Sequence, residues 1–194
     1  MPEINRPITF RQLLDECPRI EVPLIQRDYA QGRETEKEVR DHFLKTLYDA
    51  LVRAPGESPR PLNLDFVYGS IEGGDRRTFL PSDGQQRLTT LFLLHWYLAW
   101  RDMQLSDFQC MMWDGKHSRF TYAVRPSSTE FFDALVRYAP DTLPDNVPAI
   151  RKQVENQSWF FLHWRLDPTI QSALVMLEAI HGLFRPTNGL FARA

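Results

Sequence analysis

The stretch from Pro81 to Trp100, PSDGQQRLTTLFLLHWYLAW, joins two halves of opposite character. From Leu88 onward nearly every residue is apolar, which is typical of a helix that is buried on all sides. Any fold must bury this helix and must also satisfy, or use, the polar groups at its beginning. The stretch therefore predicts a buried helix that begins at a polar site formed by Asp83, Gly84, Gln85, Gln86 and Arg87.

Periodicity and breaker residues predict the other elements of the first half. Thr9 is a suitable N-cap for a short helix, and Ile20 and Val22 alternate with charged residues as in a strand. Residues 62–83 predict a β-hairpin that leads directly to the polar site. Between strand and hairpin, residues 34–53 predict an amphipathic helix whose apolar face consists of Val39, Phe43, Leu47, Ala50 and Leu51.

The second half predicts one strand and several helices. Residues 119–124 are expected to form the strand, and Ser127 or Ser128 to be the N-cap of the helix that follows. A further helix is expected within 146–157, and a last one begins at Pro168. Together the elements indicate an α+β fold, with one domain over 1–105 and a mainly helical extension over 106–194. We expect the chain to be a piece of a longer protein.

Composition excludes some classes of protein. The chain has 194 residues, of which 43% are hydrophobic, and a formal net charge of -2. It therefore has enough apolar residues for a core but no overall basic excess that would attract DNA or a membrane surface, although a local basic groove remains compatible. Two cysteines and five scattered histidines do not have the spacing of metal ligands. With no signal sequence and no apolar stretch long enough to span a bilayer, we expect a soluble cytoplasmic protein.

The polar site before the buried helix has two interpretations. Asp83 could be an N-cap, paired with Gln86 as in a capping box. Alternatively, Gly84 would let a ligand approach the backbone, and Arg87 lies in a first turn where the helix dipole disfavours a cation. Free N–H groups, a glycine and a guanidinium at one helix start favour an anion such as phosphate. Asp83 could then cap the helix, hold a metal ion or orient a water molecule.

A second polar cluster, in the segment VPLIQRDY, contains Gln26, Arg27, Asp28 and Tyr29. It follows a strand and a proline, so it is expected on an exposed loop. The loop could simply be solvated, with the tyrosine packed against the core. Alternatively, glutamine and arginine could bind base edges or phosphates while the tyrosine stacks on a base.

The motifs IQRDY and DGQQRLTTL, in this order with a helix and a hairpin between them, resemble the N-terminal domain of GmrSD-type modification-dependent restriction enzymes. FVYGSIE, FTYAVRPSSTEFFDAL and WFFLHWRLDPTIQSALVMLEAIH extend the resemblance over about residues 20–184. The resemblance implies a ParB/sulfiredoxin-like fold for the N-terminal domain. It also implies that a nucleoside triphosphate is bound and hydrolysed with Mg²⁺, in bacterial defence against phage or foreign, often modified, DNA.

By carry-over from this family, Gly84, Gln85, Gln86 and Arg87 would bind the nucleotide. Asp83, Gln86 and Arg87 would be catalytic, and Asp83 would hold the metal ion. Gln26, Arg27 and Tyr29 would line the same pocket or sense modified DNA.

The resemblance also implies partners. Complete family members usually carry a C-terminal HNH-like nuclease domain. Because this chain has no such His and Asn constellation, the nuclease is expected in a separate or C-terminal domain. Nucleotide, DNA and this nuclease are the expected partners, and a second copy of the chain is a further candidate. The alternative function is a nucleotide- or DNA-sensing module that does not hydrolyse NTP and that regulates a separate nuclease.

Overall fold

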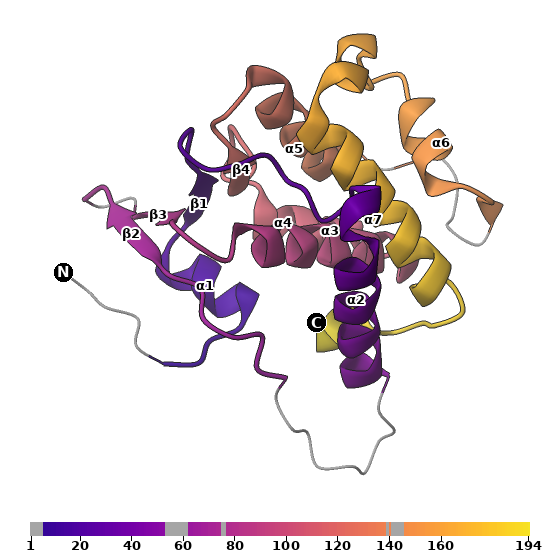
Figure 1. The fold of residues 1–194 in the computed structure, drawn as a ribbon, viewed down its shortest axis with the longest axis horizontal. Helices are drawn as coiled ribbons and strands as arrows, with labels where there is room; N and C mark the ends of the chain where they lie inside the picture. The colour runs from indigo at the N-terminus through magenta and orange to yellow at the C-terminus, as the bar shows by residue number, and fades with distance from the viewer. Residues whose placement is uncertain (1–5, 53–61, 75–76, 139, 141–145) are drawn as a thin grey trace.

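The computed structural model describes residues 6–52, 62–74, 77–138, 140 and 146–194 (Figure 1). The described chain is an α+β fold. Its elements, in order, are α1 Phe10–Glu16, β1 Arg19–Val22, the 3₁₀ turn η1 Glu34–Glu36, α2 Lys37–Leu51, β2 Gly69–Glu72, β3 Thr78–Pro81, α3 Gln85–Arg101, α4 Leu105–Met112, β4 Phe120–Tyr122, α5 Pro126–Arg137, α6 Ile150–Glu155, the 3₁₀ turn η3 Leu162–Leu166, α7 Pro168–Phe184 and the 3₁₀ turn η4 Phe191–Arg193.

Four short strands form one mixed sheet in the order β2-β3-β1-β4. β2 and β3 are the two antiparallel strands of the predicted hairpin. β1 lies inside the sheet and pairs in parallel with both β3 and β4. Its two apolar side chains, Ile20 and Val22, are fully buried, as their alternation with charged residues predicts. The second strand of the hairpin, β3, leads directly to the start of α3.

Helix α3 is the centre of the core, which confirms the prediction of a buried helix. Figure 1 shows it crossing the middle of the molecule, with α4, α5 and α7 around it. Phe92, Trp96 and Leu98 are 0% exposed. Aromatic rings from other elements pack against it, including Phe108 of α4 and Phe132 of α5. Within the described residues, no helix combines the length and the apolar character needed to cross a bilayer.

The two predicted domains share one sheet and one core. β4, which lies in the predicted helical extension, pairs with β1, so that Ile20 is opposite Phe120 and Val22 is opposite Tyr122. The buried hydrophobic residues of both halves form one cluster. The division between residues 105 and 106 therefore does not separate two cores.

The apolar face of α2 agrees with the prediction at Phe43, Leu47 and Leu51 and differs at Val39. The helix buries Arg40, Leu44 and Leu47, whereas Val39 is 56% exposed. Arg40 is buried because its Nη1 donates a hydrogen bond of 3.1 Å to the backbone oxygen of Gly32, in the loop beside the helix. The buried face therefore includes Arg40 and Leu44 beside the predicted Phe43, Leu47 and Leu51, which all contact the core.

Two further differences lie in the second half. The N-cap of α5 is Arg125, with Pro126 at the first helical position, rather than Ser127 or Ser128. Both serine hydroxyls instead donate to the carboxylate of Asp167, the N-cap of α7, at 2.5 and 2.8 Å. α4 also has no counterpart among the predicted elements. The serines thus join the beginnings of two helices, a long-range contact that a local capping rule does not consider.

Candidate functional site

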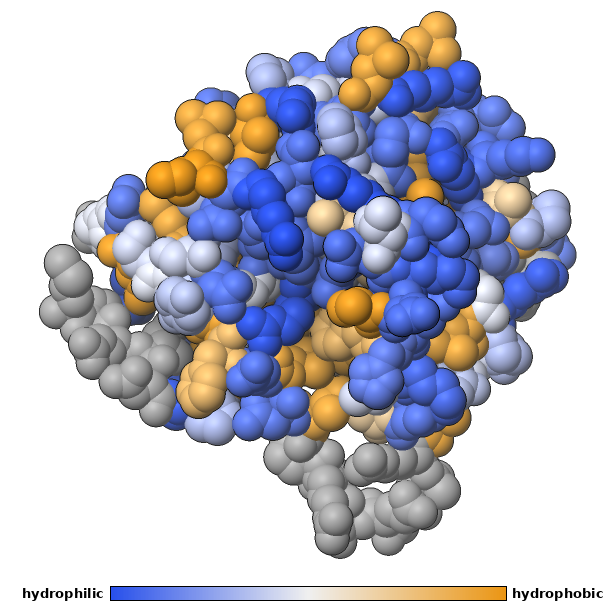
Figure 2. Space-filling view, viewed as in Figure 1, coloured by the Kyte–Doolittle hydropathy of each residue, from blue (hydrophilic) through white to orange (hydrophobic). Residues whose placement is uncertain are grey.

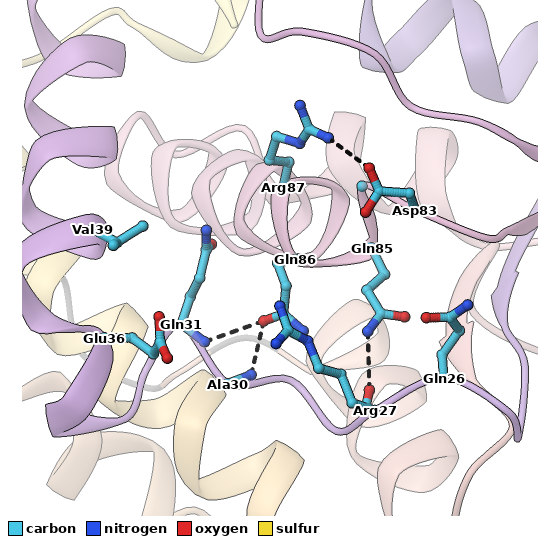
Figure 3. Close-up of a pocket in the computed structure, with 11 residues that line it drawn as sticks. Gln26, Arg27, Ala30, Gln31, Glu36, Val39, Asp83, Gln85, Gln86 and Arg87 are labelled. Atoms are coloured by element: carbon cyan, nitrogen blue, oxygen red, sulfur yellow. Dashed lines mark hydrogen bonds and ion pairs between the residues drawn. The ribbon is translucent and has the colours of Figure 1, made fainter.

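Both polar motifs contribute to one pocket of about 510 Å³ (Figure 3). Pockets that hold small molecules typically have volumes of about 300–1,000 Å³. Figure 2 shows that hydrophilic residues predominate on the side of the molecule seen in Figure 1. The residues that line the pocket come from the loop after β1, from the start of α2 and from the start of α3: Gln26, Arg27, Ala30, Gln31, Glu36, Val39, Asp83, Gly84, Gln85, Gln86 and Arg87.

The beginning of α3 carries no side-chain cap from the described residues. The N-cap is Gly84, with a left-handed φ of 84°, and not Asp83. The capping-box interpretation of Asp83 and Gln86 is therefore wrong. Glycine is required here for two reasons, because a φ near this value strains other residues and because an added Cβ would lie 2.7 Å from Cγ2 of Val67. Within the described part of the chain no side chain accepts from the first-turn N–H groups, which are donors of the kind that bind anions.

Arg87 holds an extended segment against the start of α3. Its Nη1 donates to the backbone oxygen of Leu64 at 2.7 Å, and its Nη2 donates to that of Phe66 at 2.6 Å. Nη2 also lies 3.3 Å from Oδ2 of Asp83. These contacts offset the unfavourable position of a cation in the first turn. Arg87 thus has a structural role at the site, and the side chain of Asp83 remains 56% exposed.

Gln86 forms hydrogen bonds with the backbone of the loop that contains the second motif. Its Oε1 accepts hydrogen bonds from the backbone nitrogens of Ala30 at 2.8 Å and Gln31 at 3.2 Å, and its Nε2 donates to the backbone oxygen of Asp28 at 3.2 Å. An amide oxygen has two acceptor positions, and here both are occupied. A catalytic use of this oxygen would therefore require release of the loop.

Gln85 and Gln26 form two further links between the motifs. The Nε2 of Gln85 donates to the backbone oxygen of Arg27 at 3.1 Å, and the Nε2 of Gln26 donates to that of Ser82 at 3.0 Å. The Oε1 of Gln85 is buried and has no hydrogen-bond partner among the described residues. An unsatisfied buried acceptor of this kind costs about 1–3 kcal/mol. Gln85 lines the pocket, but this oxygen is closed to solvent in this structure.

Arg27 and Tyr29 have opposite environments. The Arg27 side chain is exposed and forms no hydrogen bond or ion pair with any described residue; Figure 3 shows it extending past Gln86. Tyr29 is 0% exposed, and its hydroxyl is 2.8 Å from Oγ1 of Thr90. Burial raises the pKa of Tyr29 well above its ordinary value. Tyr29 lies beneath the pocket, so its ring cannot stack on a ligand in this conformation.

Helix α7 also contacts the loop that contains the second motif. The backbone nitrogen of Tyr29 donates to Oγ1 of Thr169 at 3.3 Å. Gly32 passes so close to α7 that an added Cβ would lie 1.8 Å from the backbone oxygen of Ser172. Asp28 is also ion-paired with Arg125, the N-cap of α5. The pocket loop is therefore positioned by the second half of the chain as well as by α3.

Four pocket residues lie outside the predicted site: Ala30, Gln31, Glu36 and Val39. Gln31 could have been noticed, because it follows Tyr29 by two residues on the same predicted loop. Glu36 and Val39 carry no comparable signal. Both were assigned to an amphipathic helix, and only the structure shows that Val39 is exposed rather than part of the apolar face.

The comparisons with known proteins give one match. No curated protein and no solved structure shows significant similarity to the chain. The family model described as GmrSD restriction endonuclease, N-terminal domain, matches residues 10–185, which include both motifs, the sheet and α7. This domain implies the context of a restriction or defence protein. The chain belongs to the GmrSD restriction endonuclease N-terminal domain family.

Proposed function

We propose that the pocket binds a nucleoside triphosphate and that the chain is an NTP-hydrolysing module of a protein that targets foreign or modified DNA. The observation that carries this proposal is the convergence of both motifs on one pocket of about 510 Å³. That pocket combines an uncapped helix start with the unpaired guanidinium of Arg27. The ParB/sulfiredoxin-like fold that the family resemblance implies is part of the same proposal.

The phosphates would bind where the pocket offers donors and positive charge. The first-turn N–H groups of α3 and the guanidinium of Arg27 are the two suitable groups. Mg²⁺ usually binds proteins through one or two carboxylates together with substrate phosphates. The exposed carboxylate of Asp83, with Glu36 elsewhere in the pocket wall, fits this requirement. Bound Mg²⁺ would neutralise phosphate charge.

Hydrolysis would need an acceptor for the attacking water. Among the residues predicted to be catalytic, Asp83 has accessible acceptor oxygens. The side-chain oxygen of Gln86 is already hydrogen-bonded to the loop. Arg87 would act by holding residues 64–66 against the start of α3. Turnover would then change the conformation of an attached or partner nuclease domain, and DNA would be the target.

A second candidate is a sensor that binds nucleotide or DNA without hydrolysis. It is favoured by the ion pair between Asp83 and Arg87, since the carboxylate faces a cation of its own helix and part of its charge is already neutralised. In this case Gln26 and Arg27 would contact the DNA, and the protein would regulate a separate nuclease.

Isothermal titration of the purified chain with each of the four NTPs and Mg²⁺ tests the proposal, with phosphate release measured on the same samples. Arg27→Ala should weaken nucleotide binding. Arg165→Ala, which changes an exposed arginine on η3, should not. Binding with turnover supports the enzyme, whereas binding without turnover, also in the presence of DNA, supports the sensor. If no nucleotide binds the wild type, the nucleotide proposal is wrong.

A further inference from the structure

We propose that Arg125 is a positioning residue of the pocket: by holding the carboxylate of Asp28, it keeps the guanidinium of Arg27 available for the phosphates of a ligand. The inference rests on the proposed nucleotide-binding function. It goes further by assigning a role at the pocket to an arginine that belongs to neither polar motif and lies outside the pocket lining.

Two neighbouring residues on the loop after β1 carry opposite charges. Arg27 lines the pocket, and its exposed guanidinium has no partner in the part of the chain that the structure describes. Asp28 follows it directly in the sequence. A carboxylate one residue away from an exposed guanidinium is within reach of an ion pair with it, and such a pair would occupy the group that is to bind phosphate. The pocket cation therefore depends on what holds Asp28 elsewhere.

Arg125 holds this carboxylate at two points. Its Nη1 donates a hydrogen bond to Oδ1 of Asp28, and its Nη2 lies 3.4 Å from Oδ2. Two contacts between a planar guanidinium and a carboxylate fix the direction of both groups. The other nearby cation, Arg33, is farther away, with its Nη2 3.9 Å from Oδ2 and its side chain 49% exposed. Arg125 is therefore the main partner of Asp28.

The sheet and two helices fix the position of Arg125. β1 and β4 are parallel neighbours, so the segments that follow them leave the same edge of the sheet. Arg125 is the N-cap of α5, and its Nη1 lies 3.9 Å from Oδ1 of the buried Asp167, the N-cap of α7. An arginine held by the scaffold in this way can restrain a carboxylate on the adjacent loop.

The charges of Arg27 and Asp28 already act on one buried group. Burial raises the pKa of Tyr122 above its ordinary value, and among the smaller effects Asp28 raises that pKa whereas Arg27 lowers it. Both charges are thus within electrostatic range of the same hydroxyl. Without Arg125, the carboxylate of Asp28 would keep only the more distant Arg33 and would be free to turn to Arg27.

Isothermal titration with the four NTPs and Mg²⁺ tests this role. For the NTP that the wild type binds, Arg125→Ala should weaken binding about two- to fivefold, which is the strength of a competing ion pair between partly exposed groups. Arg125→Lys keeps a cation beside Asp28 and should retain most of the affinity. Asp28→Asn removes the competing charge and should bind at least as tightly as the wild type. The double variant Asp28→Asn/Arg125→Ala should regain the affinity that Arg125→Ala loses.

A pair that merely braces the loop gives a different pattern. In that case Asp28→Asn would weaken binding as much as Arg125→Ala, and the double variant would stay weak; either result overturns the inference. Wild-type affinity of Arg125→Ala overturns it as well. Arg151→Ala is the matched control, since Arg151 is 40% exposed and paired with the 15% exposed Glu155, outside the pocket lining. It should bind as the wild type does.

Thermal unfolding shows whether each variant is folded at the temperature of the titration. If Arg125→Ala is not folded, Arg125→Gln takes its place, because glutamine removes the charge with a smaller loss of side-chain volume. The comparison of Arg125→Gln with and without Asp28→Asn then asks the same question.

The chemical reactivity of Arg27 gives a readout that needs no ligand. Phenylglyoxal modifies unpaired guanidinium groups, and peptide mass spectrometry measures the rate at a single arginine. The rate at Arg27 should fall in Arg125→Ala and recover in the double variant with Asp28→Asn. An unchanged rate in Arg125→Ala overturns the inference whether or not a nucleotide binds. If the rates change as expected but the wild type binds none of the four NTPs, Arg125 does control Arg27 and the nucleotide proposal alone is wrong.

Discussion

The side-chain oxygen of Gln86 lies 2.8 Å from the backbone nitrogen of Ala30, which precedes it by 56 residues. This contact explains why the two motifs occur together in one chain. The glutamines of DGQQR bind the backbone of the loop that contains QRDY, so one motif is the support for the other. Side chains of the second motif can then face the pocket while its main chain is held on α3.

Gln86→Ala should lower the free energy of unfolding by about 2–3 kcal/mol, because it leaves backbone donors of the loop without their partner. Urea unfolding measures this change. Gln109→Ala removes a half-buried glutamine that donates one hydrogen bond to a backbone oxygen and should cost less than about 1 kcal/mol. Equal effects of the two substitutions would contradict the role of Gln86 in holding the loop.

Two glycines should respond in opposite ways to alanine. Gly84→Ala should destabilise the protein by at least about 1–2 kcal/mol, because of the left-handed φ and the contact with Val67. Gly182→Ala lies within α7, where an added Cβ meets no atom within 4 Å, and should stabilise by about 0.5–1 kcal/mol. Thermal or urea unfolding of the pair gives both signs. A neutral or stabilising Gly84→Ala would show that α3 does not begin as described.

Arg87→Lys separates the charge of Arg87 from its shape. Lysine keeps the charge but cannot bond the Leu64 and Phe66 backbone oxygens as a planar fork. We therefore expect faster amide hydrogen exchange in residues 62–68 of this variant. Arg151→Lys, which alters an arginine paired with Glu155 within α6, should leave the exchange of residues 62–68 unchanged. Wild-type exchange in Arg87→Lys would mean that charge alone is sufficient at this position.

His95 should make stability depend on pH. Burial, and secondarily the nearby Arg11, lower the pKa of His95 below its ordinary value of 6.5. The unfolded chain therefore binds the proton more tightly, and the free energy of unfolding should decrease as pH falls below that value. The loss attributable to His95 is at most about 1.4 kcal/mol per pH unit. Urea unfolding between about pH 7.5 and pH 5.5 should show a smaller slope for His95→Phe than for wild type. Replacement of the exposed His42 by Asn should keep the wild-type slope.

A fragment of residues 1–105 should fail to fold. It lacks β4, which pairs with β1, and it lacks α7, which packs on α3. We expect no cooperative thermal transition and poor dispersion in an amide NMR spectrum. A fragment with a cooperative transition would show that the two predicted domains are independent.

Local rules predicted those parts of the fold that local interactions determine. Thr9 caps α1, α7 begins at Pro168, and α3 is buried along its length, as their residue types indicate. The rules failed where a distant partner decides the outcome. Arg40 is buried because it reaches Gly32, and the serines after Pro126 bond Asp167 instead of their own helix.

The sequence predicted which residues form the candidate site better than it predicted what each of them does. Its two motifs were identified from residue type, and the structure brings them into one pocket. Which side chain faces the pocket could not be deduced, because that depends on how the loop lies on α3. Tyr29 had two expected positions, against the core or in contact with a ligand, and it is buried with its hydroxyl beside Thr90. Glu36 and Val39 enter the wall from another element.

The close passage of Gly32 over Ser172 has a consequence for regulation. Because no side-chain atom separates the two backbones, the loop and α7 can hardly slide independently, and a rotation of α7 would carry Arg27 with it. A domain that pushed on α7 would open or close the pocket without touching it, and a ligand in the pocket would resist that push by the same free energy.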